Sequence, residues 1–369
     1  MKFSMRFAQV LNKAIVQSSE TFYSRLLSRF PGDMSLAFSY GSGIFPQNEN
    51  SPPLSNMLDL IFVVRDPRSW HSENMRMNKL HYWYPMRYLG PNYAFKLMEN
   101  YGAGIYYNTG IRLEGRMIKY GVISEDTIVK DLLNWNTLYL AGRLHKPVNI
   151  VHHDFENSPK LLEGLKLNLI SAVLSSLLIL PESFTEMELY HTLAGLSYAG
   201  DFRMTFGEDR NKVSNIVVSN LNHFKQLYEP VLKGICEESD RQKDPFHSFI
   251  HWKEDIGVFE QDKSPLIQLL HLNRLPFELQ LQICRLFDLR SRHVRDVEEI
   301  LKSAARYPDL SDVVKQSVIH IVQHSSKSQS LKGIVTAGPW TSVKYSATKL
   351  RKMMAGLFST KKKKQKLTT

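Results

Sequence analysis

The chain has 369 residues, enough for two or three domains and a sizeable core, and its two cysteines, Cys236 and Cys284, argue against a disulfide scaffold or a metal site built on cysteine. The formal net charge is +11, but the last acidic residue is Asp312 and the body before it is close to neutral. The basic excess therefore lies in the tail, which favours an anionic surface as partner and argues against a body that binds nucleic acid.

Two segments bear on membranes and targeting. The first twenty residues carry Lys2, Arg6 and Lys13 and no acid before Glu20, which suits a mitochondrial transit peptide and equally suits an ordinary first helix. The best candidate for a membrane span, 167–180, is interrupted by polar residues and is shorter than the roughly 18–20 residues needed. This pattern predicts a buried helix rather than an integral membrane protein.

After a predicted helix at about 21–30, two apolar strands are expected at 35–40 and 58–64, and the first runs into Gly41-Ser42-Gly43. Glycine lets the backbone approach a phosphate closely, and successive N–H groups with a serine hydroxyl cradle it. The second strand carries one acid, Asp59, which could hold Mg²⁺ against the same phosphates. This pattern resembles the phosphate-and-metal corner of a nucleotidyltransferase of the DNA polymerase β type.

The same residues have simpler interpretations. Gly-Ser-Gly is a common turn, and an acid at the start of a buried strand is often a capping or turn residue. The second acid that the superfamily usually has two positions later is here Ile61, and Asp66 is the nearest substitute.

Further along, helices are predicted at 71–81 and 91–100, and a β-hairpin is predicted around Glu114-Gly115. An amphipathic helix is expected from Asp126 to about Leu144, followed by a strand at 148–151. Beyond a polar boundary near His152–Pro159, the pattern is helical to about Leu301. These elements predict an α+β domain at 1–155, a helical domain at 156–322 and a basic tail at 323–369.

In the tail, hydrophobic residues from Trp340 to Phe358 interleave with lysines, and Lys361–Lys364 follow. On a helix, one side would collect apolar residues and the rest would be basic, which is what binding to an anionic membrane surface requires. The alternative is a solvated basic tail. We predict a membrane-binding amphipathic helix within Trp340–Lys366.

An ordered set of short motifs carries a resemblance to a known family, and it extends over nearly the whole chain. The specificity lies in the ordered set and not in any single block. The set includes Trp70-His71 with Asn74, Asn78 and His81-Tyr82; Tyr101-Gly-Ala-Gly-Ile-Tyr-Tyr-Asn108; Leu140-Ala-Gly-Arg-Leu-His-Lys-Pro147; Leu196-Ser-Tyr-Ala-Gly-Asp-Phe-Arg-Met204; and Leu331-Lys-Gly-Ile-Val-Thr-Ala-Gly-Pro339. In this order they resemble the mitochondrial CDP-diacylglycerol synthases, the peripheral phosphatidate cytidylyltransferases also described as translocator maintenance proteins. Two departures are Arg65, where an acid is frequent, and Trp83, where serine is usual.

The resemblance implies a polymerase β-like nucleotidyltransferase domain followed by a helical, winged-helix-like domain. It implies that CTP and phosphatidic acid give CDP-diacylglycerol and pyrophosphate, feeding cardiolipin synthesis, with Mg²⁺ as cofactor. It places the chain peripherally on the matrix side of the mitochondrial inner membrane. Nucleic acid is not an expected partner, and the oligomeric state is left open.

Within this frame each candidate residue receives an expected role. Asp59 is expected to be the main metal ligand and Asp66 the second. Lys119 is expected to contact the α-phosphate, and the triphosphate is expected to bind to Gly41, Ser42 and Gly43. The remaining candidates are Arg143 and Lys146 for the β- and γ-phosphates, and Asn74 and His81 for the nucleotide or the lipid phosphate. Every cation also has the simpler interpretation of a surface charge, and Asn74 and His81 equally suit hydrogen bonding within the core.

Two competing functions remain open on the sequence. The acceptor could be a nucleic acid or a protein hydroxyl, although the near-neutral body lacks a basic stripe with interleaved aromatics. Alternatively, the chain is a non-catalytic assembly or maintenance factor of the inner membrane, for which Ile61 in place of the second acid is the main support.

Overall fold

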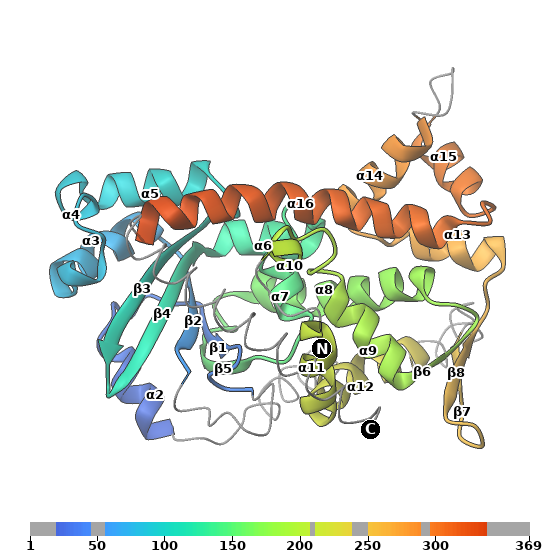
Figure 1. The fold of residues 1–369 in the computed structure, drawn as a ribbon, viewed down its shortest axis with the longest axis horizontal. Helices are drawn as coiled ribbons and strands as arrows, with labels where there is room; N and C mark the ends of the chain where they lie inside the picture. Colours follow the sequence, from blue (N-terminus) through green and yellow to red (C-terminus); the bar gives the residue numbers. More distant parts are fainter. Residues whose placement is uncertain (1–19, 46–55, 207–210, 238–249, 289–295, 338–369) are drawn as a thin grey trace, which may run out of the picture.

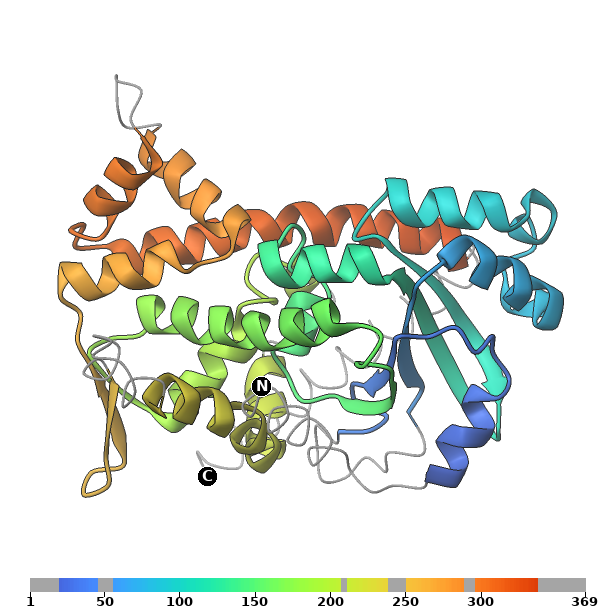
Figure 2. The ribbon, with the colours of Figure 1, turned by 180° about the vertical axis from the view of Figure 1, so that it is seen from behind.

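The computed structural model describes residues 20–45, 56–206, 211–237, 250–288 and 296–337. In these residues a five-stranded sheet occupies one end, helices occupy the other, and the long helix α16 (Leu310–Ala337) runs beside both (Figures 1 and 2). The α+β class is therefore confirmed. The predicted transit peptide and the predicted membrane segment Trp340–Lys366 lie outside the described residues.

The large sheet has the strand order β3-β4-β2-β1-β5. β1 (Leu36–Tyr40) pairs antiparallel with both β2 (Leu58–Val64) and β5 (Asn149–His153), whereas β2 runs parallel to β4 (Arg116–Ser124). β4 forms the predicted hairpin with β3 (Ile105–Leu113). Its turn residues Glu114 and Gly115 both have positive φ, 46° and 77°, so the turn bends with the twist of the two strands.

Side chains alternate along each strand, which gives the sheet two faces with separate cores. The inner face, which carries Phe38, Ile61 and Tyr107, packs on α6 (Glu125–Asn134) and α8 (Pro159–Ile179). The outer face carries Leu60, Phe62 and Tyr120 and packs on α2 (Glu20–Leu27) and α3 (Pro67–Met77). Residues on neighbouring positions of one strand therefore belong to different environments.

Four short helical elements form a lobe next to the outer face, which we call the α3–α5 lobe. They are α3, the 3₁₀ turn η2 (Lys79–His81), α4 (Met86–Leu89) and α5 (Pro91–Asn100). The predicted single helix at 71–81 is wrong in its bounds. The helix begins at Pro67 because Asp66 caps it, and it ends at Met77 before the separate turn η2.

The other end of the molecule is mainly helical. Its elements besides α8 and α16 are α9 (Glu186–Gly195), α10 (Arg203–Phe206), α11 (Lys212–Ser219), α12 (Leu221–Glu237), α13 (Pro265–Asn273), α14 (Phe277–Asp288) and α15 (Val297–Ala304). It also holds a three-stranded antiparallel sheet of β6 (Ser183–Thr185), β8 (Val258–Gln261) and β7 (Ile250–Lys253), in that order. The sequence analysis missed this sheet because strands of three or four residues are too short to show a period.

Helix α8 is, among the described residues, the one helix long and apolar enough to cross a membrane, and 67% of its apolar window is buried inside the protein. Its leucines form the centre of the inner core, together with residues from the sheet and from the helices beyond it. The prediction of a buried helix at 167–180 is confirmed. The two predicted domains 1–155 and 156–322 thus share one hydrophobic core.

The predicted start of the tail at residue 323 is wrong, because α16 continues to Ala337 without a break. Its last turns return to the sheet end of the molecule. Gln329 accepts a hydrogen bond from the Ala103 amide at 2.9 Å, and Lys332 Nζ donates to the carbonyls of Met98 and Tyr101 at 3.0 and 2.5 Å. Gln329 and Lys332, two polar residues of the segment assigned to the tail, therefore dock α16 against the sheet end of the molecule.

Candidate active site

The two charged residues Asp59 and Lys119 lie side by side on the inner face of the sheet. Strand register places Asp59 of β2 between Tyr40 of β1 and Lys119 of β4. Lys119 Nζ lies 3.8 Å from the Asp59 carboxylate, and each side chain is about one quarter exposed. Lys119 Nζ also lies 4.3 Å from the centre of the Tyr107 ring. The structure thus brings these two predicted site residues together at an accessible place.

The glycine turn lies against this pair. Gly41 has a φ of +78°, which favours glycine, and its carbonyl accepts hydrogen bonds from the amides of Ile44 and Phe45 at 3.1 and 2.9 Å. A Cβ at Gly41 would lie 3.3 Å from Asp59 Oδ2, and a Cβ at Gly43 would lie 2.6 Å from the Met57 carbonyl. Both glycines therefore allow the turn, with Ser42 between them, to pass close to the start of β2 and its carboxylate.

The predicted helix from Asp126 to Leu144 is interrupted, and the interruption positions the next cations. Trp135 and Leu138 adopt positive φ after α6 ends at Asn134, and a second short helix, α7, covers Ala141–Leu144. The buried Asp131 carboxylate accepts hydrogen bonds from four amides of the connecting turn and the start of α7, those of Thr137, Leu138, Leu140 and Ala141. One carboxylate thus organises the turn that presents Arg143.

Arg143 and Lys146 project toward residues of the helical end. The Arg143 guanidinium lies 4.7 Å from the centre of the Tyr40 ring and donates to Tyr198 Oη at 3.4 Å. Lys146 Nζ donates to the Gly142 carbonyl and to Ser197 Oγ, and lies 4.9 Å from the centre of the Tyr198 ring. Tyr40 connects these cations to Asp59, its neighbour in the sheet.

The cations around Tyr198 raise the local positive potential. Lys212 Nζ lies 5.6 Å from the centre of the same ring, so three cationic side chains surround it. Burial, with Arg143 and Lys212 nearby, holds the pKa of Lys146 well below its ordinary value. Among the described residues, neither Arg143 nor Lys146 makes an ion pair with a carboxylate. One buried and two partly buried cations arranged in this way suit a bound polyanion.

Asn74 and His81 do not join this site. The Asn74 amide donates to Tyr82 Oη and Tyr120 Oη at 3.0 and 2.9 Å, and His81 Nδ1 lies 3.2 Å from Tyr120 Oη. Because Tyr120 follows Lys119 directly along β4, its side chain is on the outer face of the sheet. The prediction that Asn74 and His81 contact the nucleotide is therefore corrected, because Asp59 lies on the other face of the sheet, and a contact with the lipid phosphate stays a prediction. Their described partners are core tyrosines, as the alternative of hydrogen bonding within the core expects.

Asp66 is also corrected as a second ligand of the Asp59 metal. It lies past the far end of β2, roughly 20 Å from Asp59 at the rise of an extended strand. Its carboxylate caps α3 by accepting from the amides of Arg68 and Ser69 at 3.0 and 3.2 Å and from Ser69 Oγ at 2.6 Å. Its neighbour Arg65 pairs with Asp33 and Asp154.

Within the described parts of the chain, no group of three or more His, Cys, Asp or Glu residues could hold a metal ion. The single carboxylate of Asp59, one quarter exposed beside the two glycines of the turn, still fits Mg²⁺, because this ion usually takes one or two carboxylates and completes its shell with water and substrate phosphates. Such a site depends on the nucleotide to supply most of the ligands.

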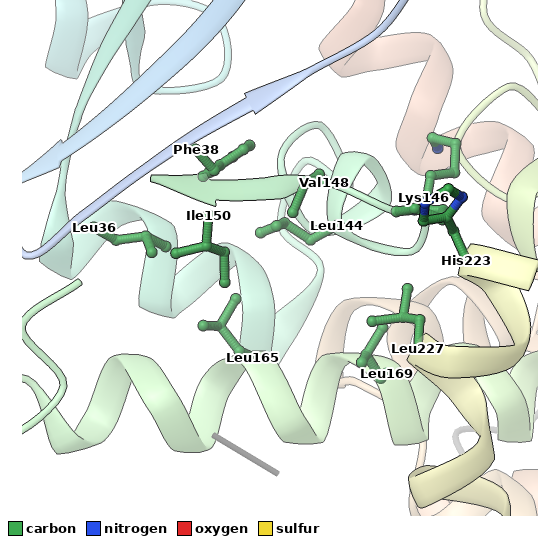
Figure 3. A pocket seen from close by; sticks show the side chains of 11 residues that line it. Leu36, Phe38, Leu144, Lys146, Val148, Ile150, Leu165, Leu169, His223 and Leu227 are labelled. Carbon is green, nitrogen blue, oxygen red and sulfur yellow. The ribbon is translucent and has the colours of Figure 1, made fainter. Parts of the chain in front are cut away.

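A small apolar cavity lies beyond the cations. Figure 3 shows Lys146 and His223 at one end of it, with the leucines of α8 and the strands β1 and β5 around the rest. Its volume is about 30 Å³, far too small for a nucleotide, so it is a gap in the packing rather than a substrate pocket. His223 also contacts Phe45, just after the glycine turn, with ring centres 5.3 Å apart.

Sequence reasoning missed Tyr40, Ser197, Tyr198 and Lys212. Tyr40 directly precedes Gly41 and could have been found from the strand register. Ser197 and Tyr198 belong to a motif that was recognised, but nothing in the sequence says that a turn after α9 reaches α7. The absence of a side chain at Gly142 permits this contact, because a Cβ there would lie 2.3 Å from Ser197 Cβ.

Comparison of the sequence with known proteins identifies a family. A family model described as phosphatidate cytidylyltransferase, mitochondrial, matches residues 23–352. Proteins of that name from Danio rerio, Xenopus laevis and Mus musculus are 49%, 47% and 47% identical, over 92%, 93% and 93% of this chain and 97%, 97% and 98% of their own. A solved nucleotidyltransferase-like protein from Exiguobacterium sibiricum covers 84% of this chain and 76% of its own at 11% identity, and its TM-score of 0.21 is too low to support an argument. The chain belongs to the mitochondrial phosphatidate cytidylyltransferase family.

Proposed function

We propose that this chain transfers the cytidylyl group of CTP to phosphatidic acid, forming CDP-diacylglycerol and releasing pyrophosphate. Family membership over nearly the whole chain supports the reaction. The observation in the structure that carries it is the juxtaposition of one carboxylate, Asp59, with a glycine turn and a line of cations from Lys119 to Lys146. This arrangement suits a triphosphate held near one metal ion.

The chemistry requires little proton transfer. A phosphate monoester has a second pKa near 6, so at neutral pH the lipid phosphate is already largely a dianion and can attack without a general base. Its oxygen forms a bond to the α-phosphorus, and the bond from that phosphorus to the bridging oxygen breaks. Pyrophosphate leaves with the electron pair of the broken bond.

The difficulty is to bring two polyanions together, and the residues of the inner face supply the positive charge. We assign Lys119 to the α-phosphate, Arg143 and Lys146 to the β- and γ-phosphates, and Gly41, Ser42 and Gly43 to the backbone that approaches the triphosphate. Asp59 is the residue that would hold Mg²⁺, which when bound neutralises phosphate charge and aligns the reacting groups. Fixed cations in a partly buried site stabilise developing charge without reorganisation.

The proposal also includes the position of the protein in the mitochondrion and the fold types of its two ends. The homologues are named mitochondrial, and we propose a peripheral position on the matrix side of the inner membrane, where the basic segment Trp340–Lys366 would bind anionic lipid. The polymerase β-like and winged-helix-like descriptions of the two ends of the molecule likewise remain expectations from the resemblance. They are tested by an experimental structure with CTP.

The experiment that tests the function measures pyrophosphate release from each of the four nucleoside triphosphates with Mg²⁺, with and without phosphatidic acid in mixed micelles. Release with CTP and the lipid together, and not with an oligonucleotide acceptor, is the expected result. If the folded protein releases no pyrophosphate under any condition, the result would favour the alternative of a non-catalytic assembly factor. The position of Asp66, away from Asp59, is the observation that supports this alternative.

A further inference from the structure

Exposed large hydrophobic side chains are concentrated in the α3–α5 lobe. Of the seventeen found among the described residues, seven fall between Met77 and Tyr101, and four of those are tyrosines: Met77, Leu80, Tyr84, Tyr88, Leu89, Tyr93 and Tyr101. Leu80 is 77% exposed and Tyr88 71%, and the rings of Tyr84 and Tyr88 contact each other with centres 5.0 Å apart. A monomeric soluble surface rarely gathers apolar groups in this way, so the lobe is a candidate interaction surface.

The charges of the lobe indicate what it contacts. Residues 67–101 hold five cations, Arg68, Arg76, Lys79, Arg87 and Lys96, against the two acids Glu73 and Glu99, of which Glu73 pairs with Arg76 at 3.3 Å. Arg76, Lys79 and Lys96 are exposed. Tyrosine has an apolar body with a polar tip and is enriched where a membrane meets water, and basic side chains among such residues are attracted to anionic lipid.

The end of α16 joins the same lobe. Lys332 holds the α16 backbone against the end of α5 through the carbonyls of Met98 and Tyr101, and the neighbouring Leu331 is 67% exposed. Figures 1 and 2 both show the last turns of α16 alongside α5. The sequence that follows Ala337 has 32 residues with nine Lys or Arg and no acid. The described helix that precedes this basic sequence therefore ends beside the aromatic lobe.

We propose that the α3–α5 lobe is a second membrane-docking surface, which binds an anionic phospholipid bilayer through its exposed tyrosines and cations while the segment after α16 binds the same bilayer. The inference rests on the proposed function, because phosphatidic acid reaches the enzyme from a membrane. Lys332 and Gln329 are then positioning residues, since they fix the start of the basic segment next to the lobe.

The test uses the full chain and a flotation assay with phosphatidylcholine vesicles that contain increasing amounts of anionic phospholipid. The lobe variant carries Leu80→Ser, Tyr84→Ser and Tyr88→Ser. The control variant carries Trp252→Ser, Ile256→Ser and Leu266→Ser, three side chains of similar exposure at the other end of the molecule. A third variant, Lys79→Gln with Lys96→Gln, tests the charge. Each is first compared with wild type in thermal unfolding.

At the anionic-lipid content where half of the wild type floats, the lobe variant should lose at least tenfold in partition coefficient and the control variant should not change. Removal of each lysine should cost about fivefold. Activity on phosphatidic acid in detergent micelles should be the same in all variants, whereas activity on vesicles should fall with flotation. If wild type itself shows no activity on phosphatidic acid in micelles, the proposed function is contradicted, whereas the flotation results still test the docking surface.

Two results would overturn the proposal. In the first, the lobe variant floats like wild type across the whole lipid titration. In the second, lipid-free wild type is a dimer in light scattering and the lobe variant is a monomer with unchanged flotation, which would make the lobe a contact between protein molecules.

Discussion

The two sides of the central sheet carry polar residues of different kinds, some on its strands and some on the helices that pack against it. On the outer face, Asn74 is buried and donates to two tyrosine hydroxyls, and His71 Nδ1 lies 2.8 Å from Tyr82 Oη. On the inner face, Asp59 and Lys119 are partly exposed, 3.8 Å apart, beside Arg143 and Lys146, which make no ion pair with a carboxylate in the described residues.

The difference distinguishes polar residues that stabilise the fold from polar residues that are available to bind a ligand. Buried polar groups that bond one another, as Asn74 does with Tyr82 and Tyr120, stabilise a fold, although His71 Nε2 and Tyr106 Oη on this side have no hydrogen-bond partner among the described residues. Cations gathered without carboxylate partners are unfavourable in the free protein and become favourable when an anion binds. Both faces contain the family motifs, so membership in a motif does not by itself distinguish the two roles.

The largest effect should come from Asp59→Asn. This change keeps the size of the side chain and removes the one carboxylate beside the glycine turn, so turnover should fall by about 10³-fold or more while the melting temperature stays near that of wild type. Pyrophosphate release and thermal unfolding measure the two quantities. Near-normal turnover in this variant would remove Asp59 from the reaction.

Asn74→Ala should show the opposite behaviour. It leaves the hydroxyls of Tyr82 and Tyr120 without their amide donor, so the free energy of unfolding should fall by about 3 kcal/mol. At a temperature where the variant is folded, its kcat and its KM for CTP should match wild type. Denaturant unfolding and steady-state kinetics check this, and a rise in KM without loss of stability would return Asn74 to the active site.

Acidic pH should lower the free energy of unfolding, in part because His71 is buried in the neutral form. Burial lowers the pKa of His71 from 6.5 to about 3, so the unfolded chain binds a proton below pH 6.5 that the folded chain does not. Stability is then fully present above pH 6.5 and declines as the pH falls toward 3, by about 2 kcal/mol between pH 7 and 5. His71→Gln should remove this share of the acid sensitivity in thermal unfolding, whereas His251→Asn, at an exposed position, should not. The remaining sensitivity comes from other buried histidines, since burial lowers the pKa of His145 to about 3 and that of His271 to about 4.

Arg143→Lys should distinguish a bidentate grip from a simple charge. Lysine keeps the charge and loses the planar fork, so the KM for CTP should rise about tenfold with a smaller change in kcat. Arg112→Lys on the exposed part of β3 is a matched control and should leave both constants unchanged. An unchanged KM in Arg143→Lys would assign the β- and γ-phosphates to other residues.

The smallest effect should come from Asp66→Ala. Loss of the cap of α3 should cost about 1 kcal/mol of stability, because two backbone amides lose their acceptor. Turnover and the dependence of activity on Mg²⁺ concentration should not change. A shifted metal dependence would restore Asp66 as a ligand and contradict the separation along β2.

The sequence predicted the inner-face residues well because strand geometry relates them directly. Asp59, the glycine turn and Lys119 lie on adjacent strands, and the strands of the large sheet together with their hairpin were all expected. Asn74 and His81 were misplaced because helical spacing shows that they share one side of a helix and says nothing about which face of a sheet that helix covers. The prediction that Asp66 is the second metal ligand was wrong, because residues that are seven positions apart along an extended strand lie far apart in space.

Other features were beyond local reasoning. The break between α6 and α7 depends on one carboxylate, Asp131, that binds four amides, and the approach of Tyr198 to Arg143 depends on packing between residues 55 positions apart. The continuation of α16 to Ala337 depends on carbonyls at the end of α5. Each is a tertiary contact that no periodic pattern reports.

The most direct test of the central claim uses CTP with a radioactive α-phosphate and phosphatidic acid in micelles, and it measures how fast the label enters lipid. Wild type, Asp59→Asn and Asn74→Ala are compared in parallel, and each rate is divided by the amount of folded protein. We predict labelled CDP-diacylglycerol at equal rates from wild type and Asn74→Ala and none above background from Asp59→Asn. Transfer by Asp59→Asn at the wild-type rate, or its loss in folded Asn74→Ala, would contradict the assignment of catalysis to the inner face.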